Sequence, residues 1–257
     1  MISLKDKIAF ITGASAGIGL ACAEAFAAAG AKTILTARRE EIIRKLSLKL
    51  KEQHKTDSLY YKLDVRNKHE IDRVVGSLPE TWKHIDILVN NAGLAKGLDP
   101  IAEADTDDFD TMIDINIKGL LYTTRALSPG MIERGTGHII NLSSIAGHQV
   151  YHGGGVYCAT KYSVDAITQA LQIELVGTPV RVTSISPGMV ETDFSMVRFK
   201  GDEARAKAVY QGLKPLSPED IADAIVYCAT RPPHVNINDM IIMPTNQANV
   251  YTIHKEL

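Results

Sequence analysis

The sequence predicts an α/β fold in which one doubly wound domain carries a seven-stranded parallel sheet with helices on both faces. Two observations predict this fold class. Short, apolar, β-branched runs alternate with longer helical patterns along the whole chain, and no internal repeat or Pro/Ser-rich linker divides its 257 residues. Continuous apolar strands are typical of a parallel sheet that is buried on both faces. We therefore expect residues 1–257 to form a single domain.

The predicted elements follow in a regular order. Strands are predicted at KIAFIT (7–12), KTILTA (32–37), LYYKLDV (59–65), DILVN (86–90), HIINLS (138–143), VRVTSIS (180–186) and DMIIMP (239–244). Helices are predicted over 17–29, 40–54 and 68–77, and then from about Asp107, Tyr157 and Pro218. In an open parallel sheet, ligands bind outside the carboxyl ends of the strands. We therefore expect a binding site in the loops that follow the strands.

Composition excludes several functional classes. The net charge is −2, which gives no broad basic field for a nucleic acid. The first residues, MISLKDKIAFIT, resemble neither a signal peptide nor a membrane span, so we expect no membrane partner. Three cysteines without metal-type spacing indicate a reducing, cytoplasmic location. The eight histidines show no ligand pattern, and we expect no metal.

A glycine-rich turn follows the first strand. In TGASAGIGL, Gly13, Gly17 and Gly19 are spaced G-x-x-x-G-x-G, with Ser15 and Ile18 between them. Glycines here let the backbone approach a pyrophosphate, and the following helix offers free N–H groups at its N-terminus. Such a turn alone can be only a tight connection. Its place after the first strand favours a dinucleotide-binding, Rossmann-type fold.

The end of the second strand predicts which dinucleotide binds. An NAD enzyme usually has an acidic residue there for the ribose 2′-hydroxyl. This chain reads TARRE, with Ala37 at that position and Arg38 and Arg39 after it. A guanidinium can bind a 2′-phosphate through two parallel hydrogen bonds. Although the arginines could be an ordinary basic start to a helix, we predict NADP, with Arg38 as the main phosphate ligand.

A tyrosine and a lysine follow the glycine run 153–155. Tyr157 and Lys161 are four residues apart, which places them on one face of a helix. Both could be solvated, or the ammonium could make the phenol a better acid. Three further motifs follow strands: NNAG (90–93), INLSSIAG with Ser144, and SPGMVET (186–192).

Together these motifs resemble the short-chain dehydrogenase/reductase family over nearly the whole chain. The resemblance implies that Asn116, Ser144, Tyr157 and Lys161 are catalytic, and that the protein is a homotetramer. It implies cofactor contacts, beyond the glycine loop and the two arginines, by Asp64, Val65, Asn91, Ala92, Gly93, Tyr157, Lys161, Pro187, Gly188, Val190 and Thr192.

The chemistry of a carbonyl reduction fits these roles. Tyr157 can donate its proton to the carbonyl oxygen, and Ser144 can hydrogen-bond the same oxygen. Lys161, together with the oxidised nicotinamide, is expected to favour the phenolate form of Tyr157. Asn116 is expected to hold a water that links Lys161 to solvent. Taken singly, Ser144 could also be a strand-end cap and Asn116 a helix-interior amide.

The sequence also suggests a small-molecule substrate class. Four segments (LPETWKHIDILVNNAGLAKG, GHIINLSSIAG, FSMVRFKGD and HVNINDMIIMPTNQA) resemble the NADP-dependent 3-hydroxy acid dehydrogenase branch. That branch acts on serine, allo-threonine and related 3-hydroxy acids, and on malonic semialdehyde. The alternatives are a carbonyl reductase for a sugar, pterin or ketoacyl group, and an NADP-binding sensor without turnover.

Residues 189–212 are expected to cover the substrate. Within them, FSMVRFKGD carries Arg198 and Lys200, and either cation could bind a substrate carboxylate. The same residues could instead form a solvated basic turn. Gln149, Tyr151 and His152 are further polar candidates for the pocket.

Overall fold

The computed structural model describes residues 2–256 and contains one sheet of seven strands, all parallel, in the order β3-β2-β1-β4-β5-β6-β7. The strands are β1 (Ile8–Thr12), β2 (Lys32–Ala37), β3 (Ser58–Lys62), β4 (Ile87–Asn90), β5 (Gly137–Leu142), β6 (Val180–Pro187) and β7 (Asp239–Ile242). The predicted fold class is confirmed. Because the strand order reverses between β1 and β4, a ligand crevice is expected at their carboxyl ends.

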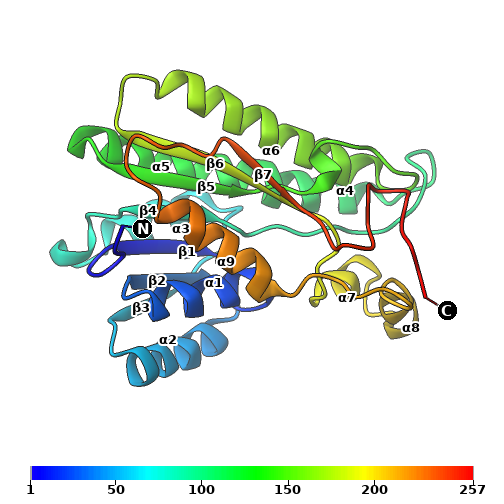
Figure 1. Ribbon diagram of the computed structural model, residues 1–257, viewed down its shortest axis with the longest axis horizontal. Helices are drawn as coiled ribbons and strands as arrows, with labels where there is room; N and C mark the ends of the chain where they lie inside the picture. Colours follow the sequence, from blue (N-terminus) through cyan, green and yellow to red (C-terminus); the bar gives the residue numbers. More distant parts are fainter. Residues whose placement is uncertain (1, 257) are drawn as a thin grey trace.

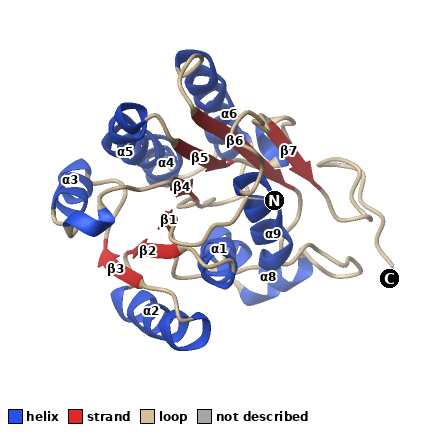
Figure 2. Cartoon of the chain, turned by 60° about the vertical axis from the view of Figure 1, so that its left-hand side comes forward, coloured by secondary structure: helices blue, strands red, loops and turns tan. Residues whose placement is uncertain are grey.

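Helices cover both faces of the sheet (Figure 2). One face carries α1 (Gly17–Ala28), α2 (Glu40–His54) and α9 (Pro218–Ala229), and the other carries α3 (Lys68–Gly76), α5 (Leu120–Arg134) and α6 (Gly155–Glu174). The remaining elements are α4 (Thr106–Ile113), the π-helix η2 (Asp114–Gly119), the 3-10 turns η1 (Glu80–Trp82) and η3 (Ile145–Gly147), α7 (Phe194–Arg198) and α8 (Glu203–Ala208).

The core consists of two apolar layers, one on each side of the sheet. Phe26 of α1 and Ile225 of α9 are fully buried against one face. Phe10 of β1 and Met131 of α5 are fully buried on the other. Burying a side chain of this size contributes about 1.5–3 kcal/mol. The two layers hold the strand ends rigidly, so the loops that follow them are fixed in position.

Two segments differ from the sequence prediction. Strand β3 ends at Lys62, because the Asp64 N–H donates to Glu70 Oε2 (3.0 Å) instead of continuing the ladder. Residues 189–212 contain two short helices that were not predicted, and the Asp202 side chain caps α8 by accepting from the Arg205 N–H. These helices lie at one end of the molecule, beside the C-terminal tail (Figure 1).

Candidate active site

A cavity of about 610 Å³ lies at the carboxyl ends of the strands. It brings together loops that are far apart in the sequence, and most of the predicted site residues line it. These are Gly13, Ser15, Gly17, Ile18, Arg38, Arg39, Asp64, Val65, Asn91, Ala92, Gly93, Ser144, Tyr157, Lys161, Pro187, Gly188, Val190, Thr192 and Arg198. Gly19, Asn116, Gln149 and Lys200 are not among the lining residues.

The glycine loop between β1 and α1 forms one end of the cavity. Gly13 has φ = +68°, a left-handed conformation that favours glycine. A Cβ at Gly19 would overlap the Gly13 carbonyl oxygen and the Asn91 amide, which itself donates to that oxygen (3.3 Å). A Cβ at Gly17 would lie 3.2 Å from Thr192 Cγ2. The loop is therefore packed as closely as glycine permits.

The two arginines after β2 have different surroundings. Arg39 donates from Nε to Ser15 Oγ (3.1 Å) and from Nη2 to Ser15 O (3.2 Å), so it is bound to the glycine loop. Arg38 is exposed at the cavity wall, and its side chain makes no hydrogen bond or ion pair within residues 2–256. No carboxylate occupies position 37, where Ala37 is buried. Arg38 is therefore the guanidinium with donors free for a ligand.

Asp64 and Val65 line the cavity in the turn after β3. The Asp64 carboxylate pairs with Arg66 (2.6 Å), and the hydrogen bonds from Arg66 hold its pKa below the ordinary value. Val65 packs closely against η2. A Cβ added at Gly119 of this helix would lie only 2.6 Å from Val65 Cγ2. The turn after β3 is therefore held by the Asp64–Arg66 ion pair and by the contact of Val65 with η2.

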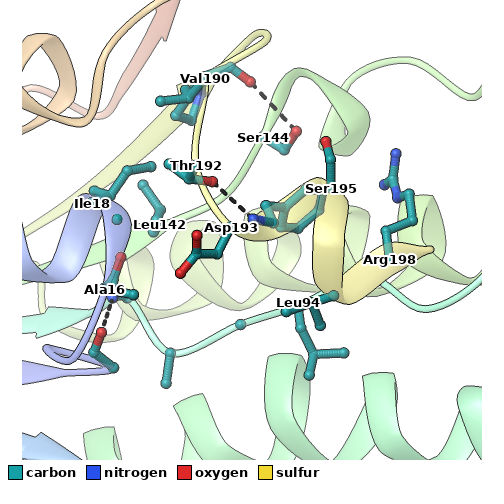
Figure 3. A pocket seen from close by; sticks show the side chains of 18 of the residues that line it. Ala16, Ile18, Leu94, Leu142, Ser144, Val190, Thr192, Asp193, Ser195 and Arg198 are labelled. Atoms are coloured by element: carbon teal, nitrogen blue, oxygen red, sulfur yellow. Dashed lines mark hydrogen bonds between the residues drawn. The ribbon is translucent and has the colours of Figure 1, made fainter. Parts of the chain in front are cut away.

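Tyr157 and Lys161 lie on one buried face at the start of α6. Their side chains are close, with Lys161 Nζ 5.9 Å from the Tyr157 ring centroid. Lys161 Nζ donates to the backbone carbonyl of Leu142 (2.7 Å), at the end of β5. Ser144 caps η3 by accepting from the Ala146 N–H (3.1 Å). Ser144 thus acts as a cap, one of the two roles considered for it, and also lines the cavity (Figure 3).

The electrostatics of the pair also involve Arg198 of α7. Burial raises the pKa of Tyr157, and the neighbouring Arg198 and a hydrogen bond with Ser144 oppose the rise. Burial lowers the pKa of Lys161 to about 8. Arg198 is therefore one cation that favours the phenolate. The sequence did not reveal this, because Arg198 lies 41 positions after Tyr157 (198 − 157).

The Asn116 side chain makes three hydrogen bonds within the protein. It lies in the π-helix η2, accepts from the Leu94 N–H (2.9 Å), and donates to Leu94 O (2.8 Å) and Thr160 Oγ1 (3.0 Å). These three bonds connect the loop after β4 to α6. These bonds fit a helix-interior amide, and the water-holding role of Asn116 stays a prediction. The site uses Asn116 to hold Leu94 and the Tyr157 helix together.

Arg198 of α7 is surrounded by aromatic rings. Its guanidinium carbon lies 4.8 Å from the Phe194 ring centroid, 5.0 Å from that of Tyr157 and 5.7 Å from that of Tyr151. Its Nη2 donates to the Tyr151 hydroxyl (2.7 Å), whereas its Nε is buried without a hydrogen-bond partner among the described residues. A Cβ at Gly154 would overlap the Tyr151 ring, which explains part of the glycine run.

Three of the substrate candidates, Gln149, His152 and Lys200, are not among the lining residues, whereas Tyr151 is. Lys200 pairs with Asp108 (2.8 Å) and Asp105 (3.3 Å). Gln149 Oε1 accepts from the Val250 N–H (3.1 Å) and so fixes the C-terminal tail. That tail contributes Val250 and Ile253 to the lining, which sequence reasoning missed. No motif marks the tail, so only its apolar residues could have indicated this.

Among the described helices, none is long and apolar enough to cross a membrane. Within residues 2–256, no group of three or more His, Cys, Asp or Glu side chains could hold a metal ion.

Comparisons with known proteins agree with this geometry. The family model described as short chain dehydrogenase matches residues 7–203. NADP-dependent 3-hydroxy acid dehydrogenase YdfG of Escherichia coli K12 is 49% identical over 243 residues, covering 94% of this chain and 96% of the relative. Sulfoacetaldehyde reductase 2 of Chromohalobacter salexigens is 46% identical over 244 residues, covering 95% of this chain and 96% of the relative.

A solved structure also matches closely. The closed form of serine dehydrogenase complexed with NADP+ has a TM-score of 0.91 and 46% identity, with 97% of this chain and 100% of that chain covered. With the sheet order, the glycine loop and the Tyr157–Lys161 pair, these matches place the chain in the short-chain dehydrogenase/reductase family of oxidoreductases.

Proposed function

We propose that this protein transfers hydride between NADP(H) and a small 3-hydroxy acid or its 3-oxo acid. L-Serine, L-allo-threonine and the 3-hydroxypropionate/malonic semialdehyde pair are the substrate types. The observation that carries the substrate class is Arg198, whose buried Nε has no partner in the described chain and lies in the cavity of Tyr157 and Ser144. The names of the relatives, 3-hydroxy acid dehydrogenase and serine dehydrogenase, support the same class.

The residues present fit NADP. The close-packed glycine loop can bind a pyrophosphate through its backbone N–H groups, and Arg38 can bind a 2′-phosphate. Asp64, Val65 and Asn91 line the same cavity and would face the adenosine part. Pro187, Gly188, Val190 and Thr192 would hold the nicotinamide side. When bound, NADP supplies the hydride acceptor or donor.

Side chains of the protein itself donate and accept the proton. Burial favours the neutral phenol of Tyr157, which is the form that donates to a carbonyl oxygen during reduction. Ser144 lies at the same wall and can hydrogen-bond that oxygen as negative charge develops. Arg198 offsets part of the cost of forming the phenolate, and Lys161 provides a second cation near the ring. For oxidation, the phenolate accepts the hydroxyl proton.

Arg198 is proposed to recognise the substrate carboxylate. Arg198→Ala should raise KM for 3-hydroxypropionate about ten- to a hundredfold, since a charge-assisted hydrogen bond contributes about 1.5–3 kcal/mol. KM for an uncharged alcohol of similar size should change much less. Lys200→Ala is the matched control, because Lys200 is a cation two residues away that lies outside the cavity lining. An equal effect of Arg198→Ala on charged and uncharged substrates would contradict this role.

A sulfonate is a second anion that Arg198 could bind. The sulfoacetaldehyde reductase relative motivates one added arm of the same assay, with sulfoacetaldehyde as substrate. Preference for sulfoacetaldehyde over malonic semialdehyde would move the substrate class from carboxylates to sulfonates. Preference for an uncharged sugar, pterin or ketoacyl compound would support the carbonyl-reductase alternative instead.

Location, assembly and domain organisation form the last part of the proposal. We propose a cytoplasmic homotetramer, in which residues 1–257 form one catalytic domain and 189–212 cover the substrate. Free, buried cysteines support a reducing compartment, and apolar side chains exposed on neighbouring α5 and α6 support an interface there. These side chains are Leu121, Ile132, Tyr162 and Ile173. Sedimentation equilibrium measures the assembly directly.

A further inference from the structure

Helix α7, which carries Arg198, is contacted from outside by Tyr210, a residue with no part in the mechanism described above. The helix has only five residues, and Ser195 and Arg198 both project from it (Figure 3). Ser195 is 5% exposed, and its Oγ lies 3.0 Å from the hydroxyl oxygen of Tyr210. Both residues line the cavity. A helix this short has little stability of its own, so its tertiary contacts determine where it lies.

The Tyr210 hydroxyl also donates to the backbone carbonyl of Val190 (3.0 Å). A carbonyl only accepts and a phenol has one proton, so the Ser195 hydroxyl is the donor in the other bond. The two hydrogen bonds form a chain from α7 through Tyr210 to the loop after β6. Without the phenol oxygen, the Ser195 hydroxyl and the Val190 carbonyl would both lose this partner.

The Val190 end of this chain is anchored in the backbone. Val190 forms a parallel bridge with Leu216. In this bridge the Glu191 N–H donates to Leu216 O (2.9 Å), and the Leu216 N–H donates to Met189 O (2.9 Å). Because these bonds hold Val190 from both neighbouring residues, Tyr210 connects α7 to a fixed segment.

Two further contacts of α7 lie at its ends. At its start the Phe194 N–H donates to Thr192 Oγ1 (3.1 Å), and at its end Arg198 O accepts from the Gly97 N–H (2.9 Å). Two end contacts define the axis of a helix better than its rotation about that axis. The bond to Tyr210 lies between them, so it restrains the rotation and with it the direction of the Arg198 side chain.

We propose that Tyr210 is a positioning residue for the anion site: its hydroxyl, through Ser195, sets the rotation of α7 that directs Arg198 into the cavity. The Arg198 guanidinium, whose carbon lies 4.8 Å from the Phe194 ring centroid, is the group that would contact the substrate. Tyr210 acts through it. This inference rests on the proposed function, because Arg198 is assigned there to the substrate carboxylate.

The direct test is equilibrium binding of 3-hydroxypropionate to the enzyme–NADPH complex, followed by NADPH fluorescence. No hydride transfer occurs in this complex, because the cofactor is already reduced and the ligand is the alcohol. Tyr210→Phe should raise Kd about two- to tenfold, the net contribution of one neutral hydrogen bond. Ser195→Ala removes the same bond from α7 and should raise Kd to a similar extent. Kd for 1,3-propanediol, which carries no anion, should change much less in both variants.

A double-mutant cycle shows whether Tyr210 acts through Arg198. In an Arg198→Ala background, Tyr210→Phe should raise Kd by less than about twofold, since the effects of coupled residues are not additive. Tyr122→Phe is the matched control, because this α5 tyrosine is half-buried and its hydroxyl makes no hydrogen bond within residues 2–256. It should leave Kd unchanged.

The outcomes separate this inference from the proposed function. If Arg198→Ala weakens binding and Tyr210→Phe does not, this inference is overturned and the proposed function stands. If Arg198→Ala has no effect, both are overturned. Equal effects of Tyr210→Phe with and without Arg198 would mean that Tyr210 contacts the ligand itself, which would also overturn the inference. If circular dichroism shows that neither Tyr210→Phe nor Ser195→Ala folds, the bond is purely structural and the inference fails.

Discussion

We propose that the proton chemistry of this site depends on one residue, Tyr157. We predict that Tyr157→Phe lowers kcat by about 10²–10⁴-fold, the usual contribution of a general acid or base. The variant should keep its fold, because the phenol oxygen forms none of the bonds that join α6 to η2 and β5. Stopped-flow reduction at saturating NADPH measures the loss, and circular dichroism checks the fold. Near-normal turnover in Tyr157→Phe would show that another group donates the proton.

We propose that a second residue, Arg38, decides the choice between NADP and NAD. We predict that Arg38→Asp weakens NADP binding by tenfold or more, since a charge-assisted contact contributes about 1.5–3 kcal/mol. NAD binding should change far less, because NAD has no 2′-phosphate. Arg39→Ala is an informative comparison, because Arg39 contacts Ser15 of the loop and its loss should affect both cofactors. Equal kcat/KM for NADP and NAD in the unchanged enzyme would refute the assignment of Arg38.

At the scale of elements, the glycine loop depends on close packing. We predict that Gly19→Ala destabilises the protein by about 1–3 kcal/mol, because the added Cβ overlaps Asn91 and the Gly13 carbonyl. The loop should then bind NADPH more weakly. Gly76→Ala is the matched control, because a Cβ at this helical glycine meets nothing within 4 Å and should raise stability by about 0.5–1 kcal/mol. Thermal unfolding compares the two, and equal Tm values would contradict the prediction.

The elements also show what the sequence could and could not predict. The strands and the residues after them were predictable, because a buried parallel strand has a continuous apolar pattern and its carboxyl end marks the site. The π-helix η2 was not, because its geometry follows from the tertiary bonds of Asn116 to Leu94 and Thr160. Arg198 was predicted as a substrate ligand, but its effect on Tyr157 depends on how α7 packs, which no local pattern specifies.

At the scale of the whole molecule, the fold brings distant segments to one cavity. The glycine loop, the α6 pair and α7 come from the beginning, middle and end of the chain, and the parallel sheet aligns the strand ends from which the loops extend. The C-terminal tail completes the wall, and the Glu256 N–H donates to Gly212 O (2.8 Å) next to the 189–212 segment. The glycine loop, Tyr157 and Arg198 thereby line one cavity at the end of a single sheet.

The central claim is that this cavity oxidises a small 3-hydroxy acid with NADP. The most direct measurement is kcat/KM of the purified enzyme with NADP for 3-hydroxypropionate and for 1,3-propanediol, which has a hydroxymethyl group in place of the carboxylate. We predict a preference of about tenfold or more for 3-hydroxypropionate, because only its carboxylate can pair with Arg198. Equal kcat/KM for both compounds, or turnover of neither, would contradict the claim.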